Sequence, residues 1–228
     1  MRIKFHTLLC VFLMWAIPGL AVVKPHVISF GKWTTVKWLA GPIENRTLDL
    51  KVRALYVDTR LKEYTTAAPH EVTDRLFVVP RVFRLNDSLP DEGGGMPRWQ
   101  WERGGWLLLD GVTGRITLIA LAEFGPLHST ASWYRDCTAY CGVSDDGKKL
   151  FAMVVQLGRR KPILKRALGE TAGDDLSDSP CSAPTWQRQP PRATFQPRQG
   201  QAVVFSVRGL TIDLVNDDDT EQGETGSK

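Results

Sequence analysis

The chain has 228 residues, of which 43% are hydrophobic and 24% charged, and its formal net charge is +4 at pH 7. A chain of this length can bury a substantial core and amounts to about one ordinary domain. The weak positive charge lacks the dense basic patches of nucleic-acid-binding proteins, so we expect no nucleic-acid partner.

The N-terminal 21 residues have the three parts of a secretory signal peptide. Arg2 and Lys4 form a charged start, residues 8–17 are an uninterrupted apolar run, and Gly19 and Ala21 are the small residues that a signal peptidase requires. The apolar run is about half the ~20 residues that a membrane-spanning helix needs. We therefore expect cleavage near Ala21, a secreted or periplasmic mature protein, and no transmembrane segment in it. A retained anchor is the alternative.

The first part of the mature chain has the composition of β-strands. Two short strands are predicted within residues 26–39, on either side of Gly31. Residues 47–57 alternate between apolar and polar side chains, so the even-numbered residues from Leu48 to Tyr56 are expected to share one buried face.

The next segments alternate between weak and strong strand patterns. Residues 61–73 are polar and weakly patterned, which predicts a loop. Residues 75–85 return to strand composition, and Pro80 restricts this strand to an edge or a bulge. Residues 87–98 are rich in glycine and proline and predict a flexible surface loop.

Three further β-hairpins are predicted: residues 106–110 with 115–122, 138–143 with 149–157, and 202–207 with 210–215. In the second of these, the Asp146-Gly147 step can supply the positive φ that a tight turn needs. Together these segments predict an all-β fold of antiparallel meander hairpins, in a single β-rich domain over residues 22–215. Residues 216–228 are acidic with hardly an apolar side chain, and should form a disordered tail.

Two tracts of the chain resemble each other. Trp133 and Gly147 have the same spacing as Trp186 and Gly200, and an apolar strand pattern follows each glycine. The segment 142–153, GVSDDGKKLFAM, resembles the inner hairpin of TolB-type bacterial β-propellers, in which a Ser-Pro-Asp-Gly turn precedes a short apolar strand. Residues 195–200 are similar but match more loosely. The resemblance covers about forty residues and implies propeller-like blades. A β-sandwich or an open meander is the alternative.

The mature chain contains three cysteines, Cys137, Cys141 and Cys181. On a strand, residues four apart lie ~13 Å from each other and share a face, which is beyond the ~7 Å that a disulfide tolerates between Cα atoms. Cys181 is therefore expected to pair with Cys137 or Cys141, which leaves the other as a buried free thiol. The cysteine spacing fits no common zinc pattern and histidines are scarce, so we expect neither a metal nor another cofactor.

Two groups of residues are candidates for binding. Trp99 and Trp101 would lie on one face of an extended segment, where they can form a stacking platform for a sugar ring, although core packing is the alternative. Five cations around Pro162 can bind an acidic glycan or an anionic headgroup, or can form a solvated turn that protects a strand edge. They are Arg159, Arg160, Lys161, Lys165 and Arg166.

Signatures of catalysis are weak, and we assign no catalytic residue. The chain has no Gly-x-Ser-x-Gly nucleophile elbow. Asp110, Glu123 and Asp136 are carboxylates near predicted strand ends, and two of them within ~5–10 Å in one cleft would indicate a glycan hydrolase. Asp136 next to Arg135 is alternatively a structural ion pair.

These observations support three hypotheses about function. The first is an exported, non-enzymatic β-domain that binds a partner protein or an anionic envelope polymer through the two tryptophans and the basic turn. The second is a hydrolase that acts on glycans. The third is a structural component of the envelope.

Overall fold

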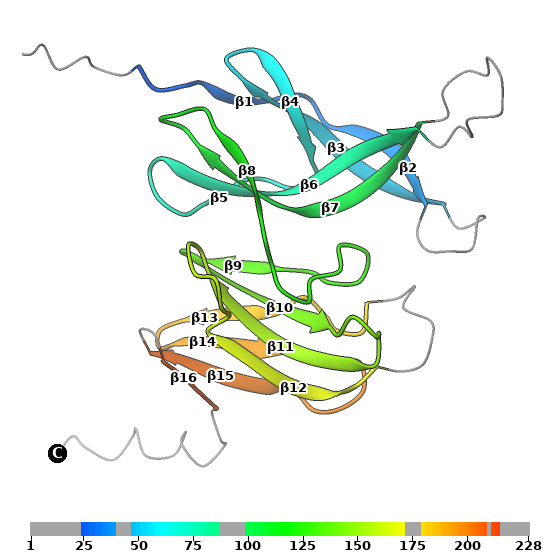
Figure 1. The fold of residues 1–228 in the computed structure, drawn as a ribbon, viewed down its shortest axis with the longest axis vertical. Coiled ribbons are helices and arrows are strands. Elements are labelled where there is room, and N and C mark those ends of the chain that lie inside the picture. The colour runs from blue at the N-terminus through cyan, green and yellow to red at the C-terminus, as the bar shows by residue number, and fades with distance from the viewer. Residues whose placement is uncertain (1–23, 40–46, 87–98, 172–178, 209–210, 215–228) are drawn as a thin grey trace, which may run out of the picture.

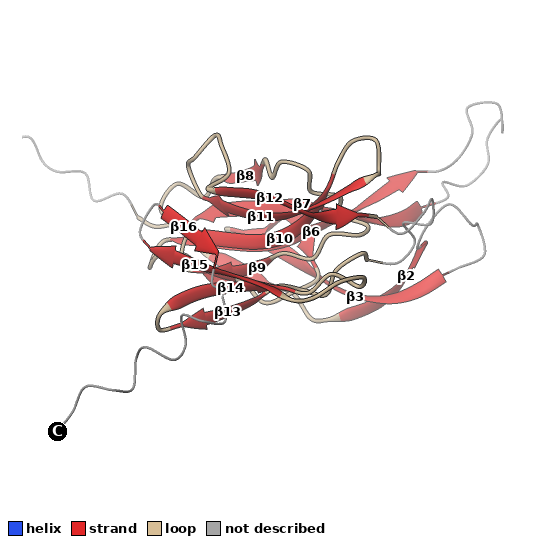
Figure 2. Ribbon diagram, turned by 90° about the horizontal axis from the view of Figure 1, so that it is seen from below, coloured by secondary structure: helices blue, strands red, loops and turns tan. Residues whose placement is uncertain are grey.

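The computed structural model describes residues 24–39, 47–86, 99–171, 179–208 and 211–214. The expected signal peptide, the glycine-rich segment 87–98 and the acidic tail 216–228 lie outside these ranges. Within them the regular secondary structure consists of β-strands alone, and Figure 2 shows red strands and no blue helix. The all-β fold of antiparallel hairpins is therefore confirmed.

The strands fall into two lobes, which Figure 1 shows one above the other. The N-terminal lobe contains β1 (Ile28–Phe30), β2 (Thr34–Leu39), β3 (Thr47–Val57), β4 (Arg60–Thr65), β5 (His70–Glu71), β6 (Leu76–Asn86), β7 (Trp99–Asp110) and β8 (Ile116–Ile119). The C-terminal lobe contains β9 (Ser132–Tyr134), β10 (Cys137–Val143), β11 (Lys149–Gln156), β12 (Leu164–Glu170), β13 (Thr185–Arg188), β14 (Pro191–Phe195), β15 (Val203–Arg208) and β16 (Thr211–Leu214).

The N-terminal lobe is a barrel. Its pairings form a ring of β2, β3, β4, β6 and β7, in which β7 also pairs with β2. Successive antiparallel pairings reverse the direction at each step, so the first and last of five strands run the same way and the ring can close only by a parallel pair. The closing pair is parallel and joins Trp38 to Trp101.

The long strand β3 buries different faces along its length. Leu50 and Val52 are buried as the alternation predicts, but further along the chain Leu55 and Val57 are buried instead of their even-numbered neighbours. The pairing of β3 with β4 shifts register between Leu55 and Tyr56, which marks a bulge. The extra residue at this shift is Lys62 of β4, and β3 has already changed its buried face before it, between Val52 and Leu55. β3 thus supplies Leu50 and Val52 to one core cluster and Leu55 to another.

The prediction of a loop over residues 61–73 is wrong, because this segment carries most of β4 and all of β5. Asp58 and Thr59 both have positive φ, 49° and 67°, and turn the chain back from β3 into β4. Tight hairpin turns of this kind usually contain glycine, and the absence of glycine at this turn is why it was not predicted. Pro80, in contrast, lies at a register shift between β6 and β7, as expected for a bulge.

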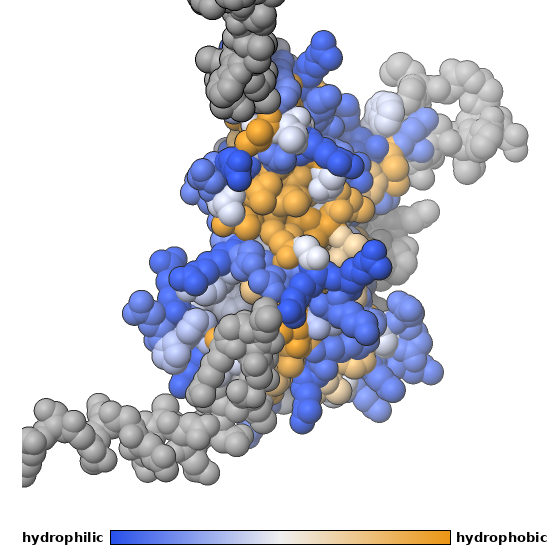
Figure 3. All heavy atoms as spheres, turned by 60° about the vertical axis from the view of Figure 1, so that its left-hand side comes forward, coloured by the Kyte–Doolittle hydropathy of each residue, from blue (hydrophilic) through white to orange (hydrophobic). Residues whose placement is uncertain are grey.

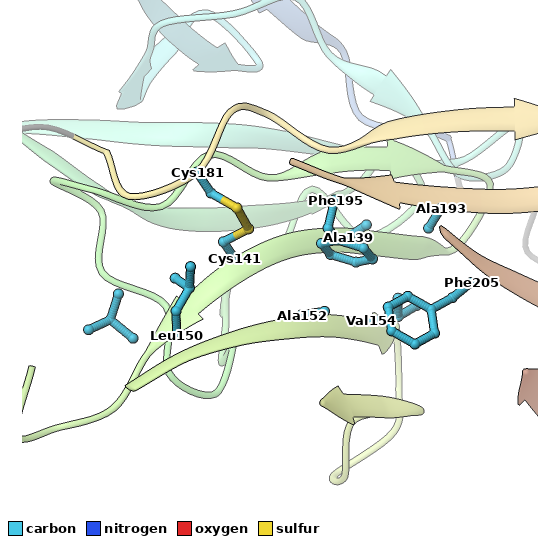
Figure 4. Packing of buried hydrophobic residues seen from close by; sticks show 10 residues of the cluster. Ala139, Cys141, Leu150, Ala152, Val154, Cys181, Ala193, Phe195 and Phe205 are labelled. Atoms are coloured by element: carbon cyan, nitrogen blue, oxygen red, sulfur yellow. A yellow bond between two sulfur atoms is a disulfide. The ribbon is translucent and has the colours of Figure 1, made fainter. Parts of the chain in front are cut away.

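The C-terminal lobe consists of two four-stranded meander sheets, β9–β12 and β13–β16. They share one apolar cluster, with Ala139, Ala152 and Val154 from the first sheet facing Phe195 and Phe205 from the second (Figure 4). This face-to-face packing is the sandwich arrangement rather than a closed propeller.

The two matching tracts occupy equivalent places in these sheets. Trp133 and Trp186 lie in the first strand of each sheet, and Gly147 and Gly200, with φ of 72° and 115°, lie in the turn between the second and third strands. The likeness to TolB-type hairpins stays a prediction.

The disulfide joins Cys141 to Cys181, one of the two partners expected, with 6.2 Å between the Cα atoms. Figure 4 shows it at one end of the shared cluster. Cys137 and Cys141 both contact this cluster, as their shared face predicts. Cys137 is a free thiol and is half-buried rather than fully buried.

The two lobes meet at Trp133. Its indole stacks on the ring of His70 at 6.1 Å and lies 5.4 Å from the indole of Trp106, and both partners belong to the N-terminal lobe. His70 Nε2 also lies 2.8 Å from the carbonyl oxygen of Arg135. Each lobe has its own core clusters. Whether residues 22–215 unfold as the single domain that the sequence predicts is a question for unfolding experiments.

Candidate binding site at the mouth of the barrel

One row of paired residues crosses four adjacent strands at the end of the barrel where β2 and β6 finish. Trp38 of β2 pairs with Leu48 of β3 on one side and with Trp101 of β7 on the other, and Trp101 pairs with Arg84 of β6. Residues paired across strands project to the same face of a sheet. The register therefore gathers two tryptophans and an arginine on one face, although they are far apart in the sequence.

Arg84 lies among aromatic rings in this row. Its guanidinium carbon is 5.4 Å from the Trp101 ring centre, 5.5 Å from that of Trp99 and 5.6 Å from that of Tyr64. The Tyr64 ring meets the Trp101 ring edge-on at 5.0 Å, which fixes the orientation of both. Within the described ranges, the structure shows no carboxylate paired with Arg84.

A second arginine covers the neighbouring tryptophan. The guanidinium carbon of Arg103 lies 4.5 Å from the ring centre of Trp38, which is only 6% exposed. We call these six residues the mouth cluster: Trp38, Tyr64, Arg84, Trp99, Trp101 and Arg103.

The tryptophans of the mouth cluster differ in accessibility. Trp101 is half-buried against the core, whereas Trp99 is 56% exposed. Core packing and a stacking platform were the two alternatives for Trp99 and Trp101, and each describes one of them. Trp101 packs on the core, and Trp99 offers an open ring face. An open indole can stack on a sugar ring, and a guanidinium beside it can pair with a carboxylate or phosphate through two hydrogen bonds.

The five cations around Pro162 lie elsewhere, in the C-terminal lobe. Three are in the turn between β11 and β12, and the other two, Lys165 and Arg166, are in β12 itself. Arg159, Arg160 and Lys161, the three in the turn, are exposed. Lys165 is committed to local contacts, because its Nζ lies 2.6 Å from Glu123 Oε1 and 4.6 Å from the ring centre of Phe151. The structure therefore does not join the basic turn and the two tryptophans into one surface.

The three candidate catalytic carboxylates are also separated. Asp110 accepts hydrogen bonds from the Thr113 hydroxyl at 2.7 Å and the Val112 amide at 2.8 Å, and these bonds hold the pKa of its carboxyl below the usual range. Glu123 pairs with Lys165, and Asp136 accepts a hydrogen bond of 2.7 Å from the Gln156 amide. Asp110 thus stabilises a turn, and each of the three has a local partner.

Two of the pockets formed by described residues are lined by none of these three carboxylates. One is a cleft of about 270 Å³ between the lobes, to which Arg81, Trp106 and Ser129 contribute. The other is a groove of about 610 Å³ on the N-terminal lobe, with apolar residues such as Phe30 and Phe77. The geometry therefore gives no support to a two-carboxylate hydrolase site.

Sequence reasoning missed four members of the mouth cluster. Arg103 follows Trp99 and Trp101 at the same two-residue spacing, so strand alternation could have added it. Trp38, Tyr64 and Arg84 could not be found in this way, because they join the cluster only through the register of β2, β4 and β6 in the closed barrel.

No protein-family model, curated protein or solved structure matches this chain. The described residues include no helix that is both long and apolar enough to cross a bilayer. They also include no group of three or more metal-binding side chains.

Proposed function

We propose that this protein is an exported, non-enzymatic β-domain that binds an anionic polymer of the cell envelope through the mouth cluster. The observation that carries the proposal is the position of Arg84, whose guanidinium lies 5.4–5.6 Å from three aromatic rings without a carboxylate partner in the described part of the chain. A cation held in this way keeps its hydrogen-bond donors available for an external anion.

The aromatic residues supply the second half of the recognition. Trp99 is 56% exposed and can stack on the apolar face of a sugar ring, while Arg84 and Arg103 pair with acidic groups on the same polymer. An acidic polysaccharide combines both features. Export is supported by the N-terminal charged and apolar pattern and by the Cys141–Cys181 disulfide, since such bonds persist in oxidising compartments.

The test is calorimetric titration of the full mature chain with polygalacturonate and with neutral dextran of similar length. We expect binding to polygalacturonate only, and weaker binding as salt concentration rises, because exposed charges are screened. Trp99→Ala and Arg84→Gln should each weaken binding about tenfold, the effect of losing roughly 1.4 kcal/mol.

Two control variants separate this site from other surfaces. Trp33→Ala removes a tryptophan that is 48% exposed and lies 4.5 Å from the Arg53 guanidinium carbon, a matched pair outside the mouth cluster. Neutralising Arg159, Arg160 and Lys161 with glutamine removes the exposed part of the basic turn. Both controls should bind as the unmodified protein does. Equal binding of dextran, or loss of binding in either control, would contradict the proposal.

The same samples distinguish the remaining hypotheses. The number of reducing ends in the polygalacturonate should stay constant on incubation, whereas its increase would mean that the protein is a hydrolase. Failure to bind either polymer, combined with tight co-sedimentation with envelope fragments, would instead favour a structural component.

A further inference from the structure

The outer edge of β8 is unpaired in the described structure. β8 pairs only with β7, and the Asp110 amide donates to the Arg115 carbonyl at 3.0 Å where the hairpin begins. Hydrogen-bonded and non-hydrogen-bonded residue pairs alternate along an antiparallel ladder. Counting from the Asp110–Arg115 pair, Thr117 and Ile119 bond to β7, so the N–H and C=O groups of Ile116 and Leu118 point away from it. Such groups are a template for another strand.

An apolar groove lies beside the turn that leads into this strand. It has a volume of about 610 Å³ and is lined by Ile28 and Phe30 of β1, Phe77 of β6, and Val112 in the turn that leads to β8. Ile116 of β8 packs on the same core cluster as Ile28, Phe30 and Phe77. Figure 3 shows apolar surface gathered on this side of the N-terminal lobe. Leu118, on β8 itself, is 61% exposed.

Three cations stand next to the two strands at the groove. Lys24 and Lys32 lie beyond the two ends of β1, and Arg115 directly precedes β8. All three are exposed, and the structure shows no carboxylate paired with them among the residues it describes. The nearby carboxylates have partners of their own. Asp74, which lines the groove, lies 3.8 Å from Arg75 Nε, Asp58 is 2.5 Å from His26 Nδ1, and Asp110 stabilises its own turn. An occupant with acidic side chains would therefore complement the charge of this surface.

We propose that β8 and the nearby groove bind an extended acidic segment of a partner protein by strand addition. The backbone of the segment pairs with Ile116 and Leu118, its apolar side chains at alternate positions enter the groove, and its acidic side chains face these cations. The acidic tail of this chain, residues 216–228, contains no large apolar side chain, so it does not fit the groove.

A backbone-modified probe tests this proposal without altering the protein. The probe is a fluorescently labelled, capped peptide of four Val-Glu repeats, titrated with the full mature chain and followed by fluorescence anisotropy. Methylating the amide nitrogens of all valines, or of all glutamates, removes one alternate set of N–H groups. Because only one set can face β8, one methylated peptide should bind at least tenfold more weakly and the other nearly unchanged.

Two comparisons guard against non-specific attraction. A peptide with four valines followed by four glutamates has the same composition but the wrong alternation, and should bind at least tenfold more weakly. Equal binding of this block peptide, or equal effects of the two methylated sets, would overturn strand addition. Arg84→Gln should leave peptide binding unchanged, which separates this surface from the mouth cluster.

Variants of the protein give an independent test. Leu118→Pro removes an outward N–H that makes no bond to β7, whereas the matched Leu118→Val keeps it. After circular dichroism has confirmed that both variants fold, only the proline variant should lose binding. Analytical ultracentrifugation identifies the occupant: a monomer supports an external partner, whereas a dimer that the peptide dissociates would assign the edge to a second copy of the chain and overturn the proposal.

Discussion

The indole of Trp133 lies 5.4 Å from the indole of Trp106, and the two residues belong to different lobes. Trp133 also stacks on His70 of the N-terminal lobe at 6.1 Å. One residue of β9 therefore supplies the aromatic contact between the two cores, and its removal should uncouple them.

Trp133→Ala should separate the unfolding of the two lobes. Large aromatic residues dominate the energetics of such contacts, so their loss weakens docking more than it weakens either core. We expect the calorimetric trace to resolve into two transitions and the radius of gyration from X-ray scattering to increase. Trp33→Ala, which removes an exposed tryptophan elsewhere, is the control. A single unchanged transition in Trp133→Ala would show that the chain unfolds as one domain.

The disulfide should contribute a large share of the stability of the C-terminal lobe. Its cysteines are 40 residues apart, and closing a loop of that size stabilises a protein by about 4 kcal/mol in the chain-entropy description. The double variant Cys141→Ala, Cys181→Ala should therefore unfold at a lower urea concentration. Cys137→Ala changes no disulfide and should shift the midpoint much less. Equal shifts would refute this role of the bond.

The thiol of Cys137 should be unreactive near neutral pH. Burial, and then the neighbouring Asp136 carboxylate, raise its pKa from 9.0 to about 11. The rate of alkylation by iodoacetamide should accordingly rise with a midpoint near pH 11 in the folded protein. Urea-unfolded protein provides the reference and should show a midpoint near 9. Identical profiles in the two states would contradict the assignment.

The same shift has a consequence for stability. The unfolded thiol loses its proton near pH 9.0, while the folded thiol keeps it to about pH 11. The folded state therefore binds more protons in this window, and the contribution of Cys137 to the free energy of unfolding decreases as pH rises through it. Cys137→Ala should remove that part of the pH dependence in urea denaturation between pH 9 and 11.

Two glycines of the C-terminal lobe should respond differently to substitution by alanine. A Cβ at Gly142 would lie 2.9 Å from Glu123 Cβ and 3.0 Å from Met153 Cγ, so β10 or the segment before β9 would have to move. At Gly158 a Cβ meets no atom within 4 Å, and only its φ of +80° opposes the change.

Gly158→Ala should destabilise the protein by about 1 kcal/mol, the usual effect of a positive φ on alanine. Gly142→Ala should destabilise it by more, in the range of about 1–3 kcal/mol that is typical of overpacking. Urea denaturation of both variants checks the order, and the reverse order would contradict the close packing of Glu123 on β10.

Local features of the fold could be predicted from the sequence, and non-local ones could not. The hairpin around Asp146-Gly147 was predictable because the turn residues and both strands are adjacent in the chain. The Asp58-Thr59 turn was not predicted, because neither residue indicates positive φ as strongly as glycine does. β4 follows that turn with largely polar side chains, and only its pairing with β3 and β6 reveals it.

The candidate site shows the same division. Alternation placed Trp99 and Trp101 on one face, but Arg84 joins them through the register of β6 with β7. The sequence predicted that Cys181 bonds to Cys137 or Cys141, because those two cysteines are too far apart on one strand to bond to each other. The choice of Cys141 depends on where Cys181 lies beside the opposite sheet, next to Pro197, and no local pattern encodes that position.

The parallel pair Trp38–Trp101 also sets an order of assembly. The ring cannot be completed until β7 has left the ribosome, because β2 pairs with β7, and four strands, β3 to β6, are synthesised between them. Each sheet of the C-terminal lobe, in contrast, can form from consecutive hairpins as it emerges. During synthesis, the N-terminal lobe therefore keeps an unpaired strand edge until its last ring strand has been made, whereas the sheets of the C-terminal lobe do not have to wait in this way.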